Sequence, residues 1–205
     1  MKPVRRVREE EALAQIVGEI RACRACAPAI APRPVLRAST TARLCIVSQA
    51  PGTKVHASGI PFTDASGDRL RSWLGVTPEE FYDERRVAII PMGFCFPGQN
   101  EKGADLPPRR ECASLWRDRL FATLQPMQLT LLIGQYAQAW HLKGKIATSL
   151  TETVARWRDY PPNLMPLPHP SWRNNGWIKA NPWFESDLLP TLRKRVRRAL
   201  SEQAA

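Results

Sequence analysis

Hydrophobic positions along the chain fall into short apolar runs separated by amphipathic stretches, a pattern that predicts strands alternating with helices. The apolar runs have the length of strands and lie at residues 43–48, 86–91, 129–133 and 164–167. The amphipathic stretches predict helices over residues 9–22, 66–75, 109–124, 134–142, 149–156 and 183–200. Because strand–helix alternation builds sheets covered on both faces, we expect a three-layer α/β/α fold with a central, mostly parallel four-stranded sheet.

A chain of 205 residues is long enough for one α/β domain and short for two, so we expect a single domain over residues 1–205. It opens with the first helix and a connector rich in proline and cysteine, together residues 9–42, and closes with the helix of residues 183–200. Ligands bind at the carboxyl ends of the strands in such sheets. Polar loops are predicted at these ends, and the functional site is expected among residues 49–68, 92–99 and 168–177.

The chain is strongly basic: 30 Lys and Arg residues against 19 Asp and Glu residues give a formal net charge of +11. This charge favours a polyanionic partner, of which nucleic acid is the commonest, and a merely basic surface is the alternative. The last predicted helix carries five cations that are either a solvated face or contacts to phosphate: Arg193, Lys194, Arg195, Arg197 and Arg198.

No apolar run approaches the roughly 20 residues of a membrane helix, and the charged residues 1–10 lack the apolar stretch of a secretory signal. We therefore expect a cytoplasmic, monomeric protein that binds DNA and no membrane. The five cysteines of a cytoplasmic chain favour metal binding or free thiols over a disulfide framework.

Three loop motifs carry the candidate chemistry. They are Gln49-Ala50-Pro51-Gly52 after the first predicted strand, the segment of residues 59–68 (GIPFTDASGD), and His169-Pro170-Ser171. Their order and context resemble the uracil-DNA glycosylase superfamily over roughly residues 15–195. With the cysteine pattern, the resemblance is closest to families four and five, which carry an iron–sulfur cluster. It implies a DNA-repair enzyme that flips a damaged base and hydrolyses its N-glycosidic bond.

Removing a base from deoxyribose passes through a cationic sugar and an anionic leaving base, so the site needs a group for each charge. The resemblance assigns the sugar cation and the attacking water to Asp64; the alternative is that Asp64 caps the helix that follows it. Asp68 is interpreted as a first-turn carboxylate that favours the helix dipole. The resemblance assigns the leaving base to His169, with a purely structural histidine as the alternative. His56 precedes Asp64 in the same loop and could reach the site, whereas His141 is interpreted as structural.

The resemblance also implies a binding pocket for the flipped base. Phe62 matches the aromatic residue that stacks on this base, with a core phenylalanine as the alternative. One position departs from family four: Pro91 replaces an asparagine that reads the uracil edge, and proline offers neither a side-chain hydrogen bond nor an amide donor. We therefore expect relaxed specificity for uracil and other deaminated bases, hypoxanthine or xanthine. The expected base-binding residues are Gln49, Ala50, Pro51, Gly52, Phe62, Pro91 and Ser171.

Four of the cysteines form a candidate metal site: Cys23 and Cys26 in a C-x-x-C, and Cys95 and Cys112 with 16 residues between them. Four thiolates suit either an iron–sulfur cluster or zinc, and the spacing does not decide between them. The resemblance implies a [4Fe–4S] cluster with a structural role. Cys95 is followed here by Phe-Pro-Gly, which departs from the family's usual Arg-Pro-Pro. Cys45 lies inside an apolar strand and is expected in the core.

The loop after the His-Pro-Ser motif is expected to contact DNA. Trp172 or Arg173 would fill the gap left by the flipped nucleotide, and Arg173 and Lys179 would contact phosphates. The alternative is that Trp172 and Trp177 pack on the final helix. The expected DNA-binding residues are Trp172, Arg173, Asn174 and Lys179.

Together these residues predict a monofunctional uracil-DNA glycosylase-type hydrolase that initiates base-excision repair. Two alternatives stay open: a non-catalytic DNA-binding or damage-sensing protein of the same fold, and a nucleoside or free-base hydrolase. The presence of both Asp64 and His169 argues against the first, and the net charge of +11 argues against the second.

Overall fold

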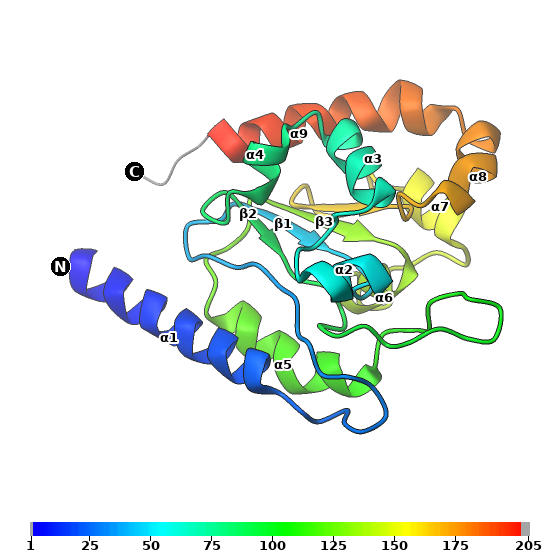
Figure 1. The fold of residues 1–205 in the computed structure, drawn as a ribbon. Helices are drawn as coiled ribbons and strands as arrows, with labels where there is room; N and C mark the ends of the chain where they lie inside the picture. The colour runs from blue at the N-terminus through cyan, green and yellow to red at the C-terminus, as the bar shows by residue number, and fades with distance from the viewer. Residues whose placement is uncertain (1, 202–205) are drawn as a thin grey trace.

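A parallel sheet forms the centre of the computed structural model, which describes residues 2–201, with side chains from residue 6 onward. The strand order is β2-β1-β3-β4, and every pairing is parallel. The sheet and the helices on both of its faces confirm the predicted three-layer α/β/α fold (Figure 1). The strands are β1 (Leu44–Val47), β2 (Val87–Ile89), β3 (Leu129–Ile133) and β4 (Leu164–Leu167).

Two helical layers cover the sheet (Figure 1). One layer consists of α3 (Ala65–Leu74), α4 (Pro78–Tyr82), α7 (Leu150–Ala155), α8 (Asn175–Ala180) and α9 (Leu189–Ser201). The other consists of α1 (Lys2–Ala22), α5 (Arg110–Ala122) and α6 (Gln135–His141). The short helix α2 (Thr53–Ser58) follows β1 and lies beside the carboxyl end of the sheet.

The two faces of the sheet hold separate cores because successive strand residues point in opposite directions. In β1, Leu44 and Ile46 pack with the α3 and α9 layer, whereas Cys45 and Val47 pack with the α1 and α5 layer. All four are fully buried, which explains why a strand covered on both faces has no polar alternation in its sequence.

The structure contains helical segments that the hydrophobic pattern did not predict. The helix α2 and the segment from η1 (Trp172–Asn174) into α8 lie in or begin in predicted loops, and α4 lies in a stretch for which no element was predicted. These segments have only three to six residues, too few to display a helical period, and α4 is defined instead by a capping box between Thr77 and Glu80. The first helix begins at residue 2 rather than 9. The hydrophobic pattern missed this start because the first turns of the helix are polar and carry no apolar stripe. The last predicted helix is a π-helical turn, η2 (Phe184–Leu188), that continues into α9.

Within the described residues, no helix is long and apolar enough to cross a membrane. The loops that leave β1, β2 and β4 meet at the carboxyl end of the sheet, as expected for a parallel arrangement.

Candidate functional site

The turn after β1 forms one wall of the site. The carbonyl of Ser48 accepts a hydrogen bond from the Met92 amide at 2.8 Å, and the carbonyl of Gln49 accepts one from the Gly93 amide at 2.9 Å. These bonds tie the turn after β1 to the loop after β2. The amide end of the Gln49 side chain lies against Gly134, where a Cβ would stand 2.8 Å from its Nε2 atom. The side chain of Gln49 is therefore directed toward the start of α6.

Phe62 holds an unusual backbone conformation at a second wall. Its φ of 57° is in the left-handed region, which a bulky residue adopts only when its surroundings fix it. The Phe62 carbonyl accepts hydrogen bonds from the Tyr82 hydroxyl at 2.9 Å and the Arg71 guanidinium at 3.2 Å. Gly67 is required behind it, since a Cβ there would stand 1.9 Å from the Phe62 oxygen. The Phe62 ring is 8% exposed and meets Phe81 edge-on.

Asp64 is the N-cap of α3, and its Oδ1 accepts a hydrogen bond from the Gly67 amide at 3.2 Å. The capping interpretation is thus confirmed. It does not remove the carboxylate from the site, because Asp64 also lines the cavity beside Phe62. Asp68 lies in the first turn of α3, as expected, and its carboxylate binds Arg71 at 2.6 Å.

The loop that carries His169 is held at several points. Asn174 donates from Nδ2 to the His169 carbonyl at 2.6 Å, and Arg69 of α3 donates to the Ser171 carbonyl at 3.1 Å. The Ser171 hydroxyl accepts a hydrogen bond from the Arg173 amide and caps η1. Ser171 and Asn174, expected to contact base and DNA, therefore also fix the backbone that positions His169.

These loops converge on a single cavity at the carboxyl end of the sheet. Its lining contains both polar and apolar residues, and Ser48, Ser66 and Asp105 join the residues singled out from the sequence. Gln49 and Ser171 line the wider groove that continues from it. The expected site residues in the cavity itself are Ala50, Pro51, Gly52, Phe62, Asp64, Pro91 and His169.

The charges around His169 act on it in opposite directions. Burial lowers the pKa of the imidazole below its usual value, and Arg173 lowers it further. Asp64 and Asp105 both oppose this and raise the pKa. The imidazole is thus a partly buried polar group that feels the charge of two carboxylates. It can donate a hydrogen bond into the cavity.

The groove outside the cavity is lined by Lys54, Gln99, Trp172, Arg173 and Asn174, among other residues. Trp172 is 71% exposed, so it does not pack on the final helix. Trp177 behaves differently: its ring meets Trp183 and Phe184, and its indole N–H donates to Thr151 at 2.7 Å. The packing alternative therefore holds for Trp177 and is wrong for Trp172.

Cationic residues outside the groove are partly engaged with the protein. Lys179 is exposed on α8 but does not line the groove. On α9, Arg193 donates to the carbonyls of Ser72 and Trp73, and Arg197 donates to that of Gly75. Arg195 donates to the Pro162 carbonyl. These arginines fasten α9 to its neighbours.

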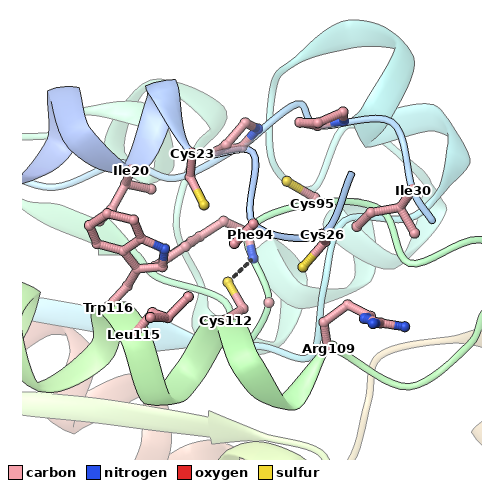
Figure 2. A pocket seen from close by; sticks show the side chains of 14 residues that line it. Ile20, Cys23, Cys26, Ile30, Phe94, Cys95, Arg109, Cys112, Leu115 and Trp116 are labelled. Carbon is pink, nitrogen blue, oxygen red and sulfur yellow. Dashed lines mark hydrogen bonds between the residues drawn. The ribbon is translucent and has the colours of Figure 1, made fainter. Parts of the chain in front are cut away.

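Four cysteines surround a second pocket, between the end of α1 and the start of α5 (Figure 2). Figure 2 shows the sulfur atoms of Cys23, Cys26, Cys95 and Cys112 around a common space. The Phe94 amide donates to Cys112 Sγ at 3.3 Å. A backbone hydrogen bond from Arg33 reaches Cys95. Amide donors of this kind stabilise thiolates.

As its side chains stand, the described part of the chain contains no group of three or more His, Cys, Asp or Glu residues arranged to hold a metal ion. The chemistry of the donor set nevertheless fits a soft metal: four thiols share one pocket, and the lining includes Ile20, Phe94 and Trp116. Burial raises the pKa of the Cys112 thiol to about 11. The fifth cysteine, Cys45, is fully buried in β1 as expected, and burial raises its pKa to about 12.

A comparison with protein-family models supports the same relationship. The model of the uracil DNA glycosylase superfamily matches residues 37–193, which include the loops after β1, β2 and β4. The chain belongs to this superfamily. Membership indicates DNA glycosylase chemistry and DNA as the substrate.

The superfamily motifs did not reveal two polar residues near the site. Asp105 lies in the loop between Cys95 and Cys112 and lines the cavity with Asp64. Arg117 of α5 is 1% exposed and donates to the carbonyls of Pro91 and Ile90 at 3.1 and 3.4 Å. Neither had a signal in its sequence neighbourhood, because both reach the site through tertiary contacts.

The other two histidines, His56 and His141, do not line the cavity that contains His169. His56 is not among the cavity-lining residues; its ring centroid lies 5.7 Å from that of Phe96. The buried Nδ1 of His56 has no hydrogen-bond partner within the described residues. His141 is partly buried and bonded to Arg117, in agreement with its structural interpretation.

Proposed function

We propose that the chain is a monofunctional DNA glycosylase that removes uracil and other deaminated bases, including hypoxanthine and xanthine, at the start of base-excision repair. The observation that carries the proposal is the meeting of Asp64, His169 and Phe62 around one cavity of a uracil DNA glycosylase superfamily member. These groups match the needs of the reaction: a carboxylate for the sugar cation, a donor for the leaving base and an aromatic surface for the flipped base.

In the proposed mechanism, water attacks C1′ of the deoxyribose while the bond from C1′ to the base nitrogen breaks and its electron pair leaves with the base. Asp64 stabilises the positive charge on the sugar, and the Gly67 amide in the first turn of α3 keeps it oriented. His169 donates a hydrogen bond to the carbonyl oxygen of the leaving base, where negative charge develops. Phe62 forms an apolar wall for the base plane.

The proposed relaxed specificity rests on Pro91. Its nitrogen carries no hydrogen, and its carbonyl is bound by Arg117 at 3.1 Å. Position 91 lines the cavity but has no side-chain group or amide donor that could hydrogen-bond to the base edge. Because position 91 does not distinguish one base edge from another, the cavity can accept uracil or another deaminated base.

We further propose that Cys23, Cys26, Cys95 and Cys112 hold a [4Fe–4S] cluster, as in families four and five of the superfamily. The support is four thiols around one pocket with amide donors to two of them. The cluster would act as a structural crosslink between the end of α1 and both ends of the loop of residues 96–111. Purified protein is then expected to be yellow-brown, with about four iron and four sulfide ions per chain. Stoichiometric zinc would contradict the assignment.

The main experiment measures excision from oligonucleotides with uracil, hypoxanthine or xanthine, single- and double-stranded. Asp64→Asn is the decisive variant, because asparagine caps a helix about as well as aspartate but carries no charge. We expect it to keep fold and DNA affinity while excision falls by a factor on the order of 10³. Asp68→Asn, which removes a carboxylate from the same helix, is the matched control and is expected to retain its rate.

An unchanged rate in Asp64→Asn would remove this residue from the mechanism. Salt-sensitive DNA binding by the wild type without product on any substrate would favour a damage-sensing protein instead.

The specificity proposal is tested by Pro91→Asn, which introduces a side chain that can hydrogen-bond to a base edge. Its base range is expected to narrow toward uracil.

A further inference from the structure

Residues 98–106 form a hairpin between Cys95 and Cys112. The Leu106 amide donates to the Gly98 carbonyl and the Asn100 amide to the Ala104 carbonyl, both at 2.9 Å. The Asn100 side chain closes the turn, since its Oδ1 accepts hydrogen bonds from the amides of Lys102 and Ala104 at 3.0 Å. The hairpin is thus fixed by its own hydrogen bonds. It holds position 105 in a defined place.

The hairpin delivers Asp105 to the candidate site. Asp105 lines both the inner cavity with Asp64 and His169 and the groove outside it. Its Oδ1 accepts a hydrogen bond from Gln99 Nε2 at 3.1 Å, across the hairpin. Its Oδ2 faces the turn after β1, where a Cβ at Gly52 would stand 3.3 Å away. The absence of a side chain at Gly52 is what gives this oxygen its room.

A carboxylate at this place opposes DNA binding. The chain has a net charge of +11, and each negative charge in the groove repels the phosphates that the other charges attract. Asp64 and Asp105 are the two carboxylates among the groove-lining residues. Since the charge of Asp105 disfavours contact with the DNA backbone, we expect this carboxylate to serve the chemical step rather than DNA binding.

We propose that Asp105 is a second catalytic carboxylate, which receives the proton of the attacking water. This inference rests on the proposed glycosylase function. The water oxygen forms its bond to C1′, the bond from C1′ to the base nitrogen breaks with its electron pair on the base, and one water proton passes to Oδ2 of Asp105. The products are an abasic deoxyribose, the base anion held by His169, and a protonated Asp105 that later loses its proton to solvent.

The two carboxylates divide the work according to their surroundings. Asp64 is bound at the N-terminus of α3, whose amides stabilise its negative charge while the sugar is cationic. Asp105 is held by the Gln99 side-chain amide on an exposed hairpin, and its Oδ2 lies beside Gly52 at the start of the short helix α2. It also faces His169, and together with Asp64 it opposes the lowering of the imidazole pKa by burial.

The test compares Asp105→Asn with Glu101→Gln in single-turnover excision of the base that the wild type removes best. Glu101 is an exposed carboxylate in the same hairpin and does not line the groove, so it is a matched charge control. We expect Asp105→Asn to slow excision at least about 100-fold, the usual contribution of a general base. DNA affinity should be equal or higher, because a negative charge has left the groove. Glu101→Gln should stay within about twofold of the wild type.

Two further measurements separate catalysis from a structural role. The wild-type rate needs both Asp64 and Asp105 in their ionised forms, so the acidic limb of the pH–rate profile should become less steep in Asp105→Asn, where only Asp64 still has to lose its proton. Formate added to Asp105→Ala should restore part of the lost rate, since a free carboxylate can occupy the emptied space.

If the wild type removes no base from any substrate, the glycosylase function and this proposal both fail. If the wild type is active and Asp105→Asn matches Glu101→Gln, only the role of Asp105 fails. Slow excision together with weakened DNA binding and no rescue by formate would show that Asp105 merely shapes the hairpin, and would also overturn the proposal.

Discussion

Two partly buried histidines, one in the cavity that Pro91 lines and one bonded to the arginine that binds the Pro91 carbonyl, show how neighbouring charge decides what an imidazole can do. Burial lowers the pKa of both His169 and His141. At His169 the carboxylates of Asp64 and Asp105 oppose this effect. At His141 the guanidinium of Arg117 adds to it, and the pKa falls to about 3. Burial alone would make the two residues alike; their charged neighbours separate them.

The region around His141 is a fixed acceptor network. Its Nε2 accepts hydrogen bonds from Arg117 Nε at 3.0 Å and Nη2 at 2.9 Å, so the ring proton is on Nδ1. The same guanidinium binds the carbonyls of Ile90 and Pro91. Within residues 6–201, no carboxylate forms a salt bridge with Arg117. A neutral histidine serves here as a hydrogen-bond acceptor for a buried cation.

The two regions are linked through the end of β2. Arg117 of α5 binds the Pro91 carbonyl, and Pro91 also lines the cavity of His169. The acceptor network therefore fixes a wall of the candidate active site without contributing a group to it. The first region supplies the proposed chemistry, and the second supplies a rigid support.

The largest expected effect is on the excision rate, when His169 is replaced. His169→Gln should lower single-turnover excision by about 10²–10³-fold, the usual loss for a donor to a developing anion. His141→Gln keeps an acceptor for Arg117 through its amide oxygen and should leave the rate within about fivefold. Equal losses in the two variants would contradict the division of roles.

The next effect is on stability. Arg117→Met should lower the free energy of unfolding by about 3 kcal/mol, because two buried carbonyls and His141 lose their donor. Arg119→Met on the same helix removes a partly exposed ion pair with Glu19 and a cation–π contact with Trp116, and should cost about 1 kcal/mol. Chemical denaturation of both variants measures the difference. Similar losses of unfolding free energy in the two variants would show that the hydrogen bonds of Arg117 stabilise the fold no more than a surface ion pair does.

A smaller effect is expected from pH. The pKa of His141 is about 3 in the folded protein, against about 6.5 in the unfolded chain. The unfolded state therefore binds more protons between these values, and stability falls as the pH falls. The loss attributable to His141 is about 2 kcal/mol between pH 7 and pH 5. Chemical denaturation at pH 7 and pH 5 measures this loss, and the free energy of unfolding of His141→Gln should change less between the two pH values. An equal change in the wild type and in His141→Gln would contradict the prediction.

The smallest effect concerns the groove. Trp172→Ala should weaken DNA binding about fivefold through lost stacking, while the salt dependence of binding stays unchanged because no phosphate contact is lost. Ile146→Ala, another exposed apolar residue outside the groove, is the control. A reduced salt dependence in Trp172→Ala would contradict the stacking role.

Individual elements show where sequence reasoning succeeded. Strands β3 and β4 were predicted with their observed bounds, because a short, continuous apolar run marks a strand buried on both faces. Asp64 illustrates a partial success: both of its predicted places, at the helix cap and in the cavity, are observed together. Asp105 was missed, because hairpin residues 98–106 carry no pattern that points toward a cavity.

The sequence by itself determined the layered α/β fold and the order of its motifs along the chain. Both follow from local signals: the period of apolar residues and short segments of fixed composition. Only the tertiary structure decided which charges face which imidazole, that Arg117 binds the back of Pro91 and that Asp105 joins Asp64. These contacts join residues far apart in the chain, and electrostatic effects depend on distance and burial in space, which no local pattern records.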